Sequence, residues 1–168
     1  MDTRKRSAFD EAARYLSNRM RTVSEMRTHL LEKEYEREEI EEVIRDFLSM
    51  NYLNDETYAK LFFERGYEKK RGARRLKREL AERGVPDDVI QNAYEDFLYE
   101  NGIDEYGTAL GIARLEAAEC REVTEKDLAR IARRLANLGY ANSDIYRILS
   151  VIRSEAAERN LDEDICDR

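Results

Sequence analysis

Residues 74–97, RRLKRELAERGVPDDVIQNAYEDF, contain two short amphipathic segments separated by Gly84 and Pro86. Apolar side chains recur one helical turn apart before the glycine, at Leu76 and Leu80, and helical spacing resumes after the proline. Glycine readily takes the left-handed conformation that ends many helices, and proline suits the start of the next one. The stretch therefore predicts a helix, a tight turn and a second helix.

The same pattern occurs in two further copies. A shift of 50 residues toward the amino terminus, or of 55 toward the carboxy terminus, aligns apolar residues with those of the central stretch. The aligned positions are Met26, Leu30, Ile40, Val43 and Phe47 in the first copy, Leu76, Leu80, Ile90, Ala93 and Phe97 in the second, and Ile131, Leu135, Ile145, Ile148 and Ile152 in the third. Such self-similarity is typical of repeat proteins.

Each copy also begins with a further helix, for which Ser7, Asn54 and Asp104 are the expected N-caps. The fold class predicted is all-α, with three tandem three-helix repeats at residues 1–52, 53–101 and 102–168. The second repeat has a basic second helix, and the third ends in a short acidic tail at residues 162–167. Because one three-helix unit has a small core, we expect neighbouring repeats to pack into an elongated, curved array.

The composition limits the class of protein. Of 168 residues, 42% are hydrophobic and 40% are charged, with a formal net charge of −7, which fits a folded acidic protein. Two cysteines far apart in the sequence do not indicate a disulfide framework or a zinc site. The sequence shows neither a signal-peptide core nor an apolar run long enough to span a membrane. We expect a cytoplasmic protein without cofactors or membrane contact.

Positive charge gathers at the second helix of the middle repeat, and residues 60–83 sum to +6. The second helices of the other repeats begin with capping boxes at Thr22 and Thr124, whereas this one begins with Gly72 followed by Arg74 and Arg75. Cations at a helix N-terminus oppose the helix dipole, at about 0.3–1 kcal/mol each. Stability alone does not explain that placement.

Uncapped amides at this helix start, together with arginine forks, predict a site for phosphate or carboxylate groups. The partner would be a nucleic-acid backbone or an acidic protein surface. The alternative is a solvated helix face whose cations pair with local glutamates. The candidate partner-binding residues are Lys69, Lys70, Arg71, Arg74, Arg75, Lys77 and Arg78.

Two linked segments, NYLNDETYAKLFFERG (residues 51–66) and KKRGARRLKRELAERGV (residues 69–85), resemble the signature of the RecX family, regulators of the RecA recombinase. The family often has glycine where this chain has Asn51. The first and third repeats match the family only in their apolar pattern. The motif positions that we interpret as mostly structural are Tyr52, Leu53, Asp55, Tyr58, Phe62, Arg65, Gly72, Leu76, Leu80 and Gly84.

The resemblance implies tandem three-helix repeats and a non-enzymatic regulator. Its partner would be the RecA-type recombinase filament on single-stranded DNA, whose growth, ATP hydrolysis and strand exchange it would restrain. We expect the protein to be a monomer. We also expect it to contact free DNA only weakly, because its net charge is negative.

Two other functions remain open from the residues alone: a general helical DNA-binding module, and a helical scaffold for another acidic protein. An enzyme is the least favoured reading, because no phosphate-binding or dinucleotide-binding glycine motif occurs. We interpret His29 as solvent-facing, Cys120 as a packing residue, and the carboxylates of residues 32–46 as a solvated helix face.

Overall fold

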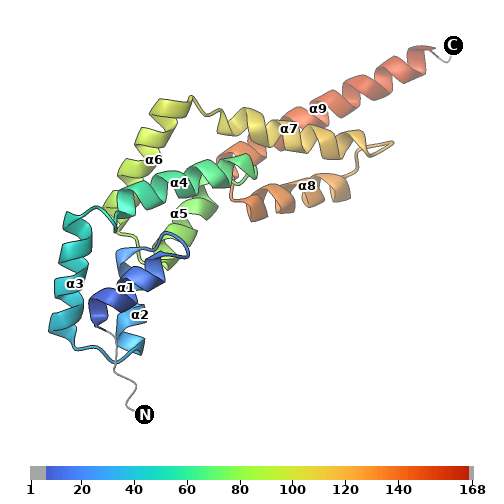
Figure 1. Cartoon of the computed structure of the whole chain (residues 1–168). Coiled ribbons are helices and arrows are strands. Elements are labelled where there is room, and N and C mark those ends of the chain that lie inside the picture. Colours follow the sequence, from blue (N-terminus) through green and yellow to red (C-terminus); the bar gives the residue numbers. More distant parts are fainter. Residues whose placement is uncertain (1–6, 167–168) are drawn as a thin grey trace. The chain divides into compact units, whose positions relative to one another are not determined.

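The computed structural model describes the backbone of residues 7–166 and the side chains of residues 7–159. Within those residues the chain forms nine α-helices and no strand, which confirms the all-α prediction (Figure 1). The helices are α1 (Ala8–Leu16), α2 (Val23–Glu32), α3 (Arg37–Ser49), α4 (Asp55–Glu68), α5 (Ala73–Glu82), α6 (Asp87–Asn101), α7 (Glu105–Ala118), α8 (Glu125–Leu138) and α9 (Asn142–Cys166). The predicted acidic tail lies outside the described side chains.

The helices pack as two compact units. The first unit contains residues 7–64 and 78–100, and the second contains residues 65–77 and 101–166. Helices α4, α5 and α6 therefore contribute residues to both units, α6 only through Asn101. The repeat boundaries after residues 52 and 101 stay predictions, and so does the curved array.

The apolar positions aligned by the repeat shifts form the cores. In the first unit α1, α2 and α3 enclose Met26, Leu30 and Phe47, each at most 2% exposed. In the second unit α7, α8 and α9 enclose Leu135 and Ile148 in the same manner. The period of the sequence thus identified core residues correctly.

Local capping also follows the sequence. Both predicted capping boxes form, at Thr22 of α2 and Thr124 of α8. The Asn54 carboxamide accepts from the Thr57 amide at 2.8 Å, and Asp104 accepts from the Gly107 amide at 2.8 Å. After the second helix of the first repeat, Glu34 takes a left-handed φ of 59° although it is not a glycine.

The start of one second helix meets the end of the next second helix. In the first unit the Thr22 hydroxyl, at the start of α2, donates to the carbonyl oxygen of Arg83, which follows α5, at 2.8 Å. In the second unit the Gly72 amide, at the start of α5, donates to the Leu138 carbonyl oxygen at the end of α8, at 2.8 Å. A cap hydroxyl in the first unit and an orphan amide in the second thus satisfy the carbonyl that ends another helix, and opposite ends of two helix dipoles meet.

A carboxylate completes each of these two junctions. The Val23 amide of α2 donates to Asp55, the first residue of α4, at 2.9 Å. The Ala73 amide of α5 donates to Glu105, the first residue of α7, also at 2.9 Å. The two donors, Val23 and Ala73, are 50 residues apart in the sequence, and so are the two acceptors, Asp55 and Glu105. The contact therefore repeats with the sequence. We call this arrangement of helix ends and carboxylate the head-to-tail junction.

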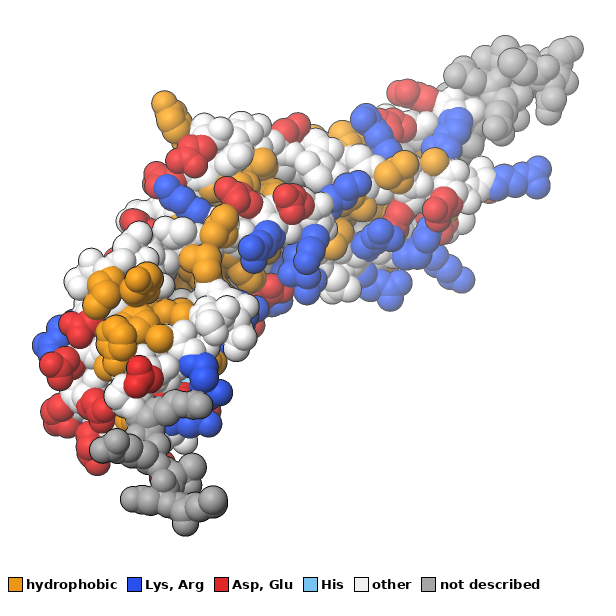
Figure 2. Space-filling view, viewed as in Figure 1, with side chains coloured by type: hydrophobic (Ala, Val, Ile, Leu, Met, Phe, Trp, Pro, Cys, Tyr) orange, Lys and Arg blue, Asp and Glu red, His pale blue; other side chains and the backbone are white. Residues whose placement is uncertain are grey.

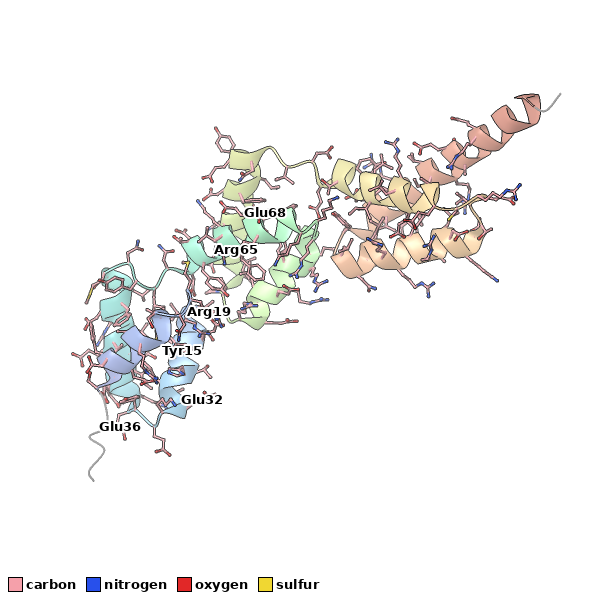
Figure 3. All side chains as sticks on the ribbon, turned by 45° about the vertical axis from the view of Figure 1, so that its right-hand side comes forward. Tyr15, Arg19, Glu32, Glu36, Arg65 and Glu68 are labelled. Carbon is pink, nitrogen blue, oxygen red and sulfur yellow. The ribbon has the colours of Figure 1, made fainter. Side chains whose placement is uncertain are left out.

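A buried acid–base pair also repeats, between α1 and α2 and between α7 and α8. Glu11 is 5% exposed and lies 2.7 Å from Arg14 and 2.9 Å from His29 Nε2, while Glu116 pairs with Arg134. The interpretation of His29 as solvent-facing is therefore wrong. The His29 ring points inward because the buried Glu11 carboxylate requires a polar partner. The ring also stacks on that of Tyr15 at 3.8 Å between centroids (Figure 3 labels Tyr15).

We predict that Gly72→Ala destabilises the second unit. A β-carbon there would lie 2.5 Å from the carbonyl atoms of Gly139, so the junction would have to open. We expect the free energy of unfolding, measured with urea and circular dichroism, to fall by about 1–3 kcal/mol. The matched control is Gly111→Ala within α7, where a β-carbon meets open space, and we expect it to raise stability by about 0.5–1 kcal/mol. Equal stability of the two variants would contradict the junction.

A second prediction concerns acid sensitivity. The hydrogen bond from Arg14, helped by His29, holds the pKa of the Glu11 carboxyl below its ordinary value. A lowered pKa contributes stability above the ordinary value, and this contribution is lost as pH falls through the lowered one. Glu11→Gln is expected to be less stable at pH 7, by about 1–3 kcal/mol, and to lose stability less steeply below about pH 5.

Denaturant titrations between pH 3 and pH 7 measure this effect, with Glu42→Gln on the exposed face of α3 as the control. A Glu11→Gln curve parallel to that of the unaltered protein would show that the pair contributes nothing.

Candidate nucleic-acid interface

The seven predicted cations do not all belong to one unit. Lys69, Lys70 and Arg71 lie in the link before α5, and the others lie on α5 itself. All except Arg78 belong to the second unit, whereas Arg78 belongs to the first, where it lies 3.7 Å from Glu82. The side chains of Lys69, Lys70, Arg74 and Arg78 are exposed, and those of Arg71, Arg75 and Lys77 are partly buried.

The link before α5 has a fixed conformation. Lys70 takes a left-handed φ of 56°, and its carbonyl oxygen accepts a hydrogen bond from the Tyr140 hydroxyl at 2.9 Å. The Arg71 amide donates to the Gly66 carbonyl at 3.0 Å. Exposed Lys69 and Lys70 therefore project from a backbone that the second unit holds in place.

The expectation that the first amides of α5 are uncapped is wrong. The Gly72 amide donates to Leu138, the Ala73 amide to the Glu105 carboxylate, and the Arg74 amide to the Gly139 carbonyl at 3.2 Å. The head-to-tail junction therefore already occupies the donors that were assigned to an external anion. Binding of phosphate at this surface has to come from side chains.

The junction also explains the cations at this helix start. Arg75 Nη1 donates to the Asn137 carbonyl in the last turn of α8 at 3.1 Å, and Arg74 Nη1 donates to the Asn142 side chain at 3.0 Å. The last turn of a helix carries the negative end of its dipole, which favours a cation. The cost of placing Arg75 at the start of α5 is thus offset by the end of α8, and the Arg74 guanidinium has a polar partner in Asn142.

A second row of cations, absent from the sequence-based prediction, lies on α8. Lys126, Arg130 and Arg133 are exposed, and their spacing of four and then three residues places them along one face of the helix. Figure 2 shows Lys and Arg side chains gathered over α8 and the first turn of α5. We call these three residues the α8 basic row.

The α8 basic row could have been found from the sequence. It lies 55 residues after Arg71, Arg75 and Arg78, which is the shift that aligns the apolar positions. The prediction missed the row because it considered only the summed charge of residues 84–168, which is negative. The corresponding positions of the first repeat, 50 residues earlier, are Arg21, Glu25 and Thr28. The shared scaffold therefore does not require basic residues at the second and third of these positions, since the first repeat has Glu25 and Thr28 there.

The electrostatics of the row leave it able to bind phosphate. Arg130 lies 3.4 Å from Asp127, whereas Arg133 Nε donates to the Ala129 carbonyl of its own helix at 3.3 Å. From Lys126 to Arg133 the helix rises roughly 10 Å. Arginine forks and a lysine spread over that length suit the backbone of a nucleic-acid strand.

The family-motif residues lie mainly at packing positions. Leu53, Leu76 and Leu80 are buried, and Tyr58 accepts a hydrogen bond from Arg83 at 3.0 Å. The others divide between the junctions, the interior and the surface: Asp55, Gly72 and Gly84 lie at the junctions, Phe62 is half-buried beneath the Arg83 guanidinium, and Tyr52 and Arg65 are exposed (Figure 3 labels Arg65).

Catalytic and metal-binding groups do not converge in the part of the chain that the structure describes. It contains no group of three His, Cys, Asp or Glu side chains placed to hold a metal ion. Burial raises the pKa of the Cys120 thiol, which disfavours the reactive thiolate. Among the described helices, none has both the length and the apolar composition needed to cross a membrane.

Comparison with known proteins identifies two matching domains. The first three-helix domain of RecX matches residues 8–47, and the second three-helix domain of RecX matches residues 54–93. The regulatory protein RecX of Halalkalibacterium halodurans is 33% identical over 138 residues, which cover 80% of this chain and 50% of that protein. That of Bacillus velezensis is 31% identical over 131 residues, covering 74% and 50%. The chain thus spans about half the length of these relatives.

Solved structures have the same fold. The crystal structure of RecX from Lactobacillus salivarius has a TM-score of 0.73 at 21% identity, and the alignment covers 87% of this chain and 94% of that one. A second crystal structure of a regulatory protein RecX has a TM-score of 0.69 at 20% identity.

The α8 basic row leads to a prediction about salt. Lys126→Ala with Arg133→Ala removes two cations that are placed to contact phosphate, so we expect binding to oligo(dT) to weaken and the slope of log K against log salt to fall by about 1.4. Fluorescence anisotropy at several salt concentrations measures both quantities.

The control variant, Arg37→Ala with Arg45→Ala, removes the same charge from exposed positions of α3. Equal losses for the two variants would mean that net charge, and not the row, governs binding.

Proposed function

The chain belongs to the RecX family of regulatory proteins, and from that premise we propose that it binds a RecA-type recombinase filament on single-stranded DNA. Binding restrains filament growth, and with it ATP hydrolysis and strand exchange. The protein acts as a ligand of the filament and performs no chemistry itself. The observation that carries the proposal is the α8 basic row beside Arg74 and Arg75 on an otherwise acidic chain.

The charge distribution favours a filament over bare DNA as the target. A net charge of −7 repels nucleic acid at long range, so a small group of cations gives weak binding to a naked strand. A nucleoprotein filament offers phosphates together with protein surface, and the protein contacts add the affinity that the phosphates alone do not supply.

The junction contributes by fixing the geometry of the cations. Arg75 is held by the Asn137 carbonyl and Arg74 by Asn142, so these side chains lose little further freedom when a partner binds. A partner meets them together with the α8 basic row as one prepared surface of the second unit.

A general DNA-binding module is the second candidate, and the α8 basic row favours it as well. The two functions differ in what they require. A DNA-binding module grips bare strands with a steep salt dependence, whereas a filament regulator acts on recombinase at salt concentrations where bare DNA is not bound.

The deciding experiment titrates this protein into DNA-stimulated ATP hydrolysis by the cognate recombinase. We predict inhibition by the unaltered protein, at salt concentrations where anisotropy detects no binding to oligo(dT). For the Lys126→Ala with Arg133→Ala variant, we expect the protein concentration that gives half-maximal inhibition to rise at least about tenfold. A hydrogen bond to a charged group contributes about 1.5–3 kcal/mol, and this variant loses two of them. Hydrolysis that continues unchanged would reject the proposal.

These variants test the surface more cleanly than reversal of Arg74 and Arg75. Both of those arginines contact the end of α8 or the start of α9, so their reversal would also disturb the junction. Lys126 and Arg133 lie outside it. Arg37→Ala with Arg45→Ala again serves as the control for charge, and is expected to inhibit like the unaltered protein.

A further inference from the structure

An apolar patch lies on the surface of the first unit. Four large side chains from α1, from the end of α3 and from the turn after it are exposed: Phe9 by 40%, Leu48 by 45%, Met50 by 48% and Tyr52 by 64%. The rings of Phe9 and Tyr52 both contact that of buried Phe47, at 4.9 and 5.8 Å between centroids. Figure 2 shows hydrophobic side chains gathered on this part of the first unit. Such groups mark interaction surfaces more often than single exposed residues do.

The backbone holds the patch in one conformation. Helix α3 ends at Ser49, and Asn51 takes a left-handed φ of 58°. The amides of Tyr52 and Leu53 then both donate to the Phe47 carbonyl, at 2.8 and 3.1 Å. Leu53 is buried and Tyr52 faces outward. The turn therefore buries Leu53, whereas the Tyr52 side chain contacts the Phe47 ring and keeps most of its surface exposed.

Acidic groups surround the patch. The Ala8 amide donates to the Glu39 carboxylate at 3.3 Å, which places Glu39 at the start of α1, next to Phe9. Asp10 follows Phe9, and Asp46 precedes Phe47, and both are exposed. Residues 24–59, which contain all of α3, sum to −7. Nucleic acid and anionic lipid are repelled by such a rim, whereas a cationic protein segment is attracted.

We propose that this patch docks a basic amphipathic segment of the recombinase itself. Apolar anchors of that segment contact Leu48, Met50 and Tyr52, and flanking Lys or Arg side chains pair with Asp46 and Glu39. This inference rests on the proposed function and extends it. The first unit binds the protein component of the filament, while the α8 basic row binds its DNA.

The test measures binding of the labelled chain to cognate recombinase without DNA, by fluorescence anisotropy. Leu48→Ser with Tyr52→Ser is expected to weaken this binding at least tenfold and to leave oligo(dT) binding unchanged. The matched control is Tyr99→Ser on α6 of the same unit, where the tyrosine is 92% exposed, and it is expected to bind normally. Asp46→Lys leaves the apolar side chains intact and is expected to weaken binding as well.

The outcomes separate this inference from the function on which it rests. If the unaltered chain inhibits ATP hydrolysis but Leu48→Ser with Tyr52→Ser and Asp46→Lys both bind recombinase normally, docking at the patch is wrong and the proposed function stands. If the unaltered chain neither binds nor inhibits recombinase, both fall. Sedimentation equilibrium tests whether a second copy of this chain binds the patch instead. A dimer that Tyr52→Ser dissociates would assign the patch to that second copy and overturn the inference.

Discussion

The start of one second helix donates hydrogen bonds to the carbonyl groups that end the next, through backbone amides at α5 and through the Thr22 hydroxyl at α2, and both units depend on this contact. Every helix leaves donors at its start and acceptors at its end, and burying them unpaired is costly. At α5 the donors of Gly72 and Arg74 find the carbonyls of Leu138 and Gly139, and Glu105 receives the amide between them. The contact requires glycine where the two backbones approach, which is why Gly72 precedes α5 at the N-cap position that threonine occupies in α2 and α8.

The junction leaves the outward faces of the second helices free to vary. Since backbone groups and one carboxylate supply the caps, Arg74 and Arg75 can occupy the first turn of α5 beside the negative end of α8. The same face carries Lys126, Arg130 and Arg133 in the third repeat, and Arg21, Glu25 and Thr28 in the first. The second unit thereby presents a basic row on a second helix, whereas the first unit presents an apolar patch with acidic neighbours on α1 and α3. We propose that these two surfaces, which differ in chemistry, engage the DNA and the protein of a recombinase filament.

The sequence predicted those features that depend on neighbours in the chain. Leu76 and Leu80 were assigned to a core because helical periodicity is local, and the capping boxes at Thr22 and Thr124 formed for the same reason. The junction was not predicted, because Gly72 and Leu138 are 66 residues apart and no local pattern links them. The error of assigning uncapped amides to an external anion followed directly from this. The α8 basic row could have been predicted from the sequence, since the shift that aligns Leu80 with Leu135 also aligns Arg75 with Arg130.

Hydrogen exchange at the start of α5 tests the junction most directly. First-turn amides of a helix have no partner within that helix and ordinarily exchange quickly. The account predicts that the amides of Gly72, Ala73 and Arg74, followed by NMR, exchange as slowly as that of Leu80 in the interior of the same helix. The first turn of α3, where Glu36 makes no side-chain cap bond, provides the fast reference at Glu38 and Glu39. Exchange of the three α5 amides at the rate of that reference would contradict the junction, and with it the arrangement of the proposed binding surface.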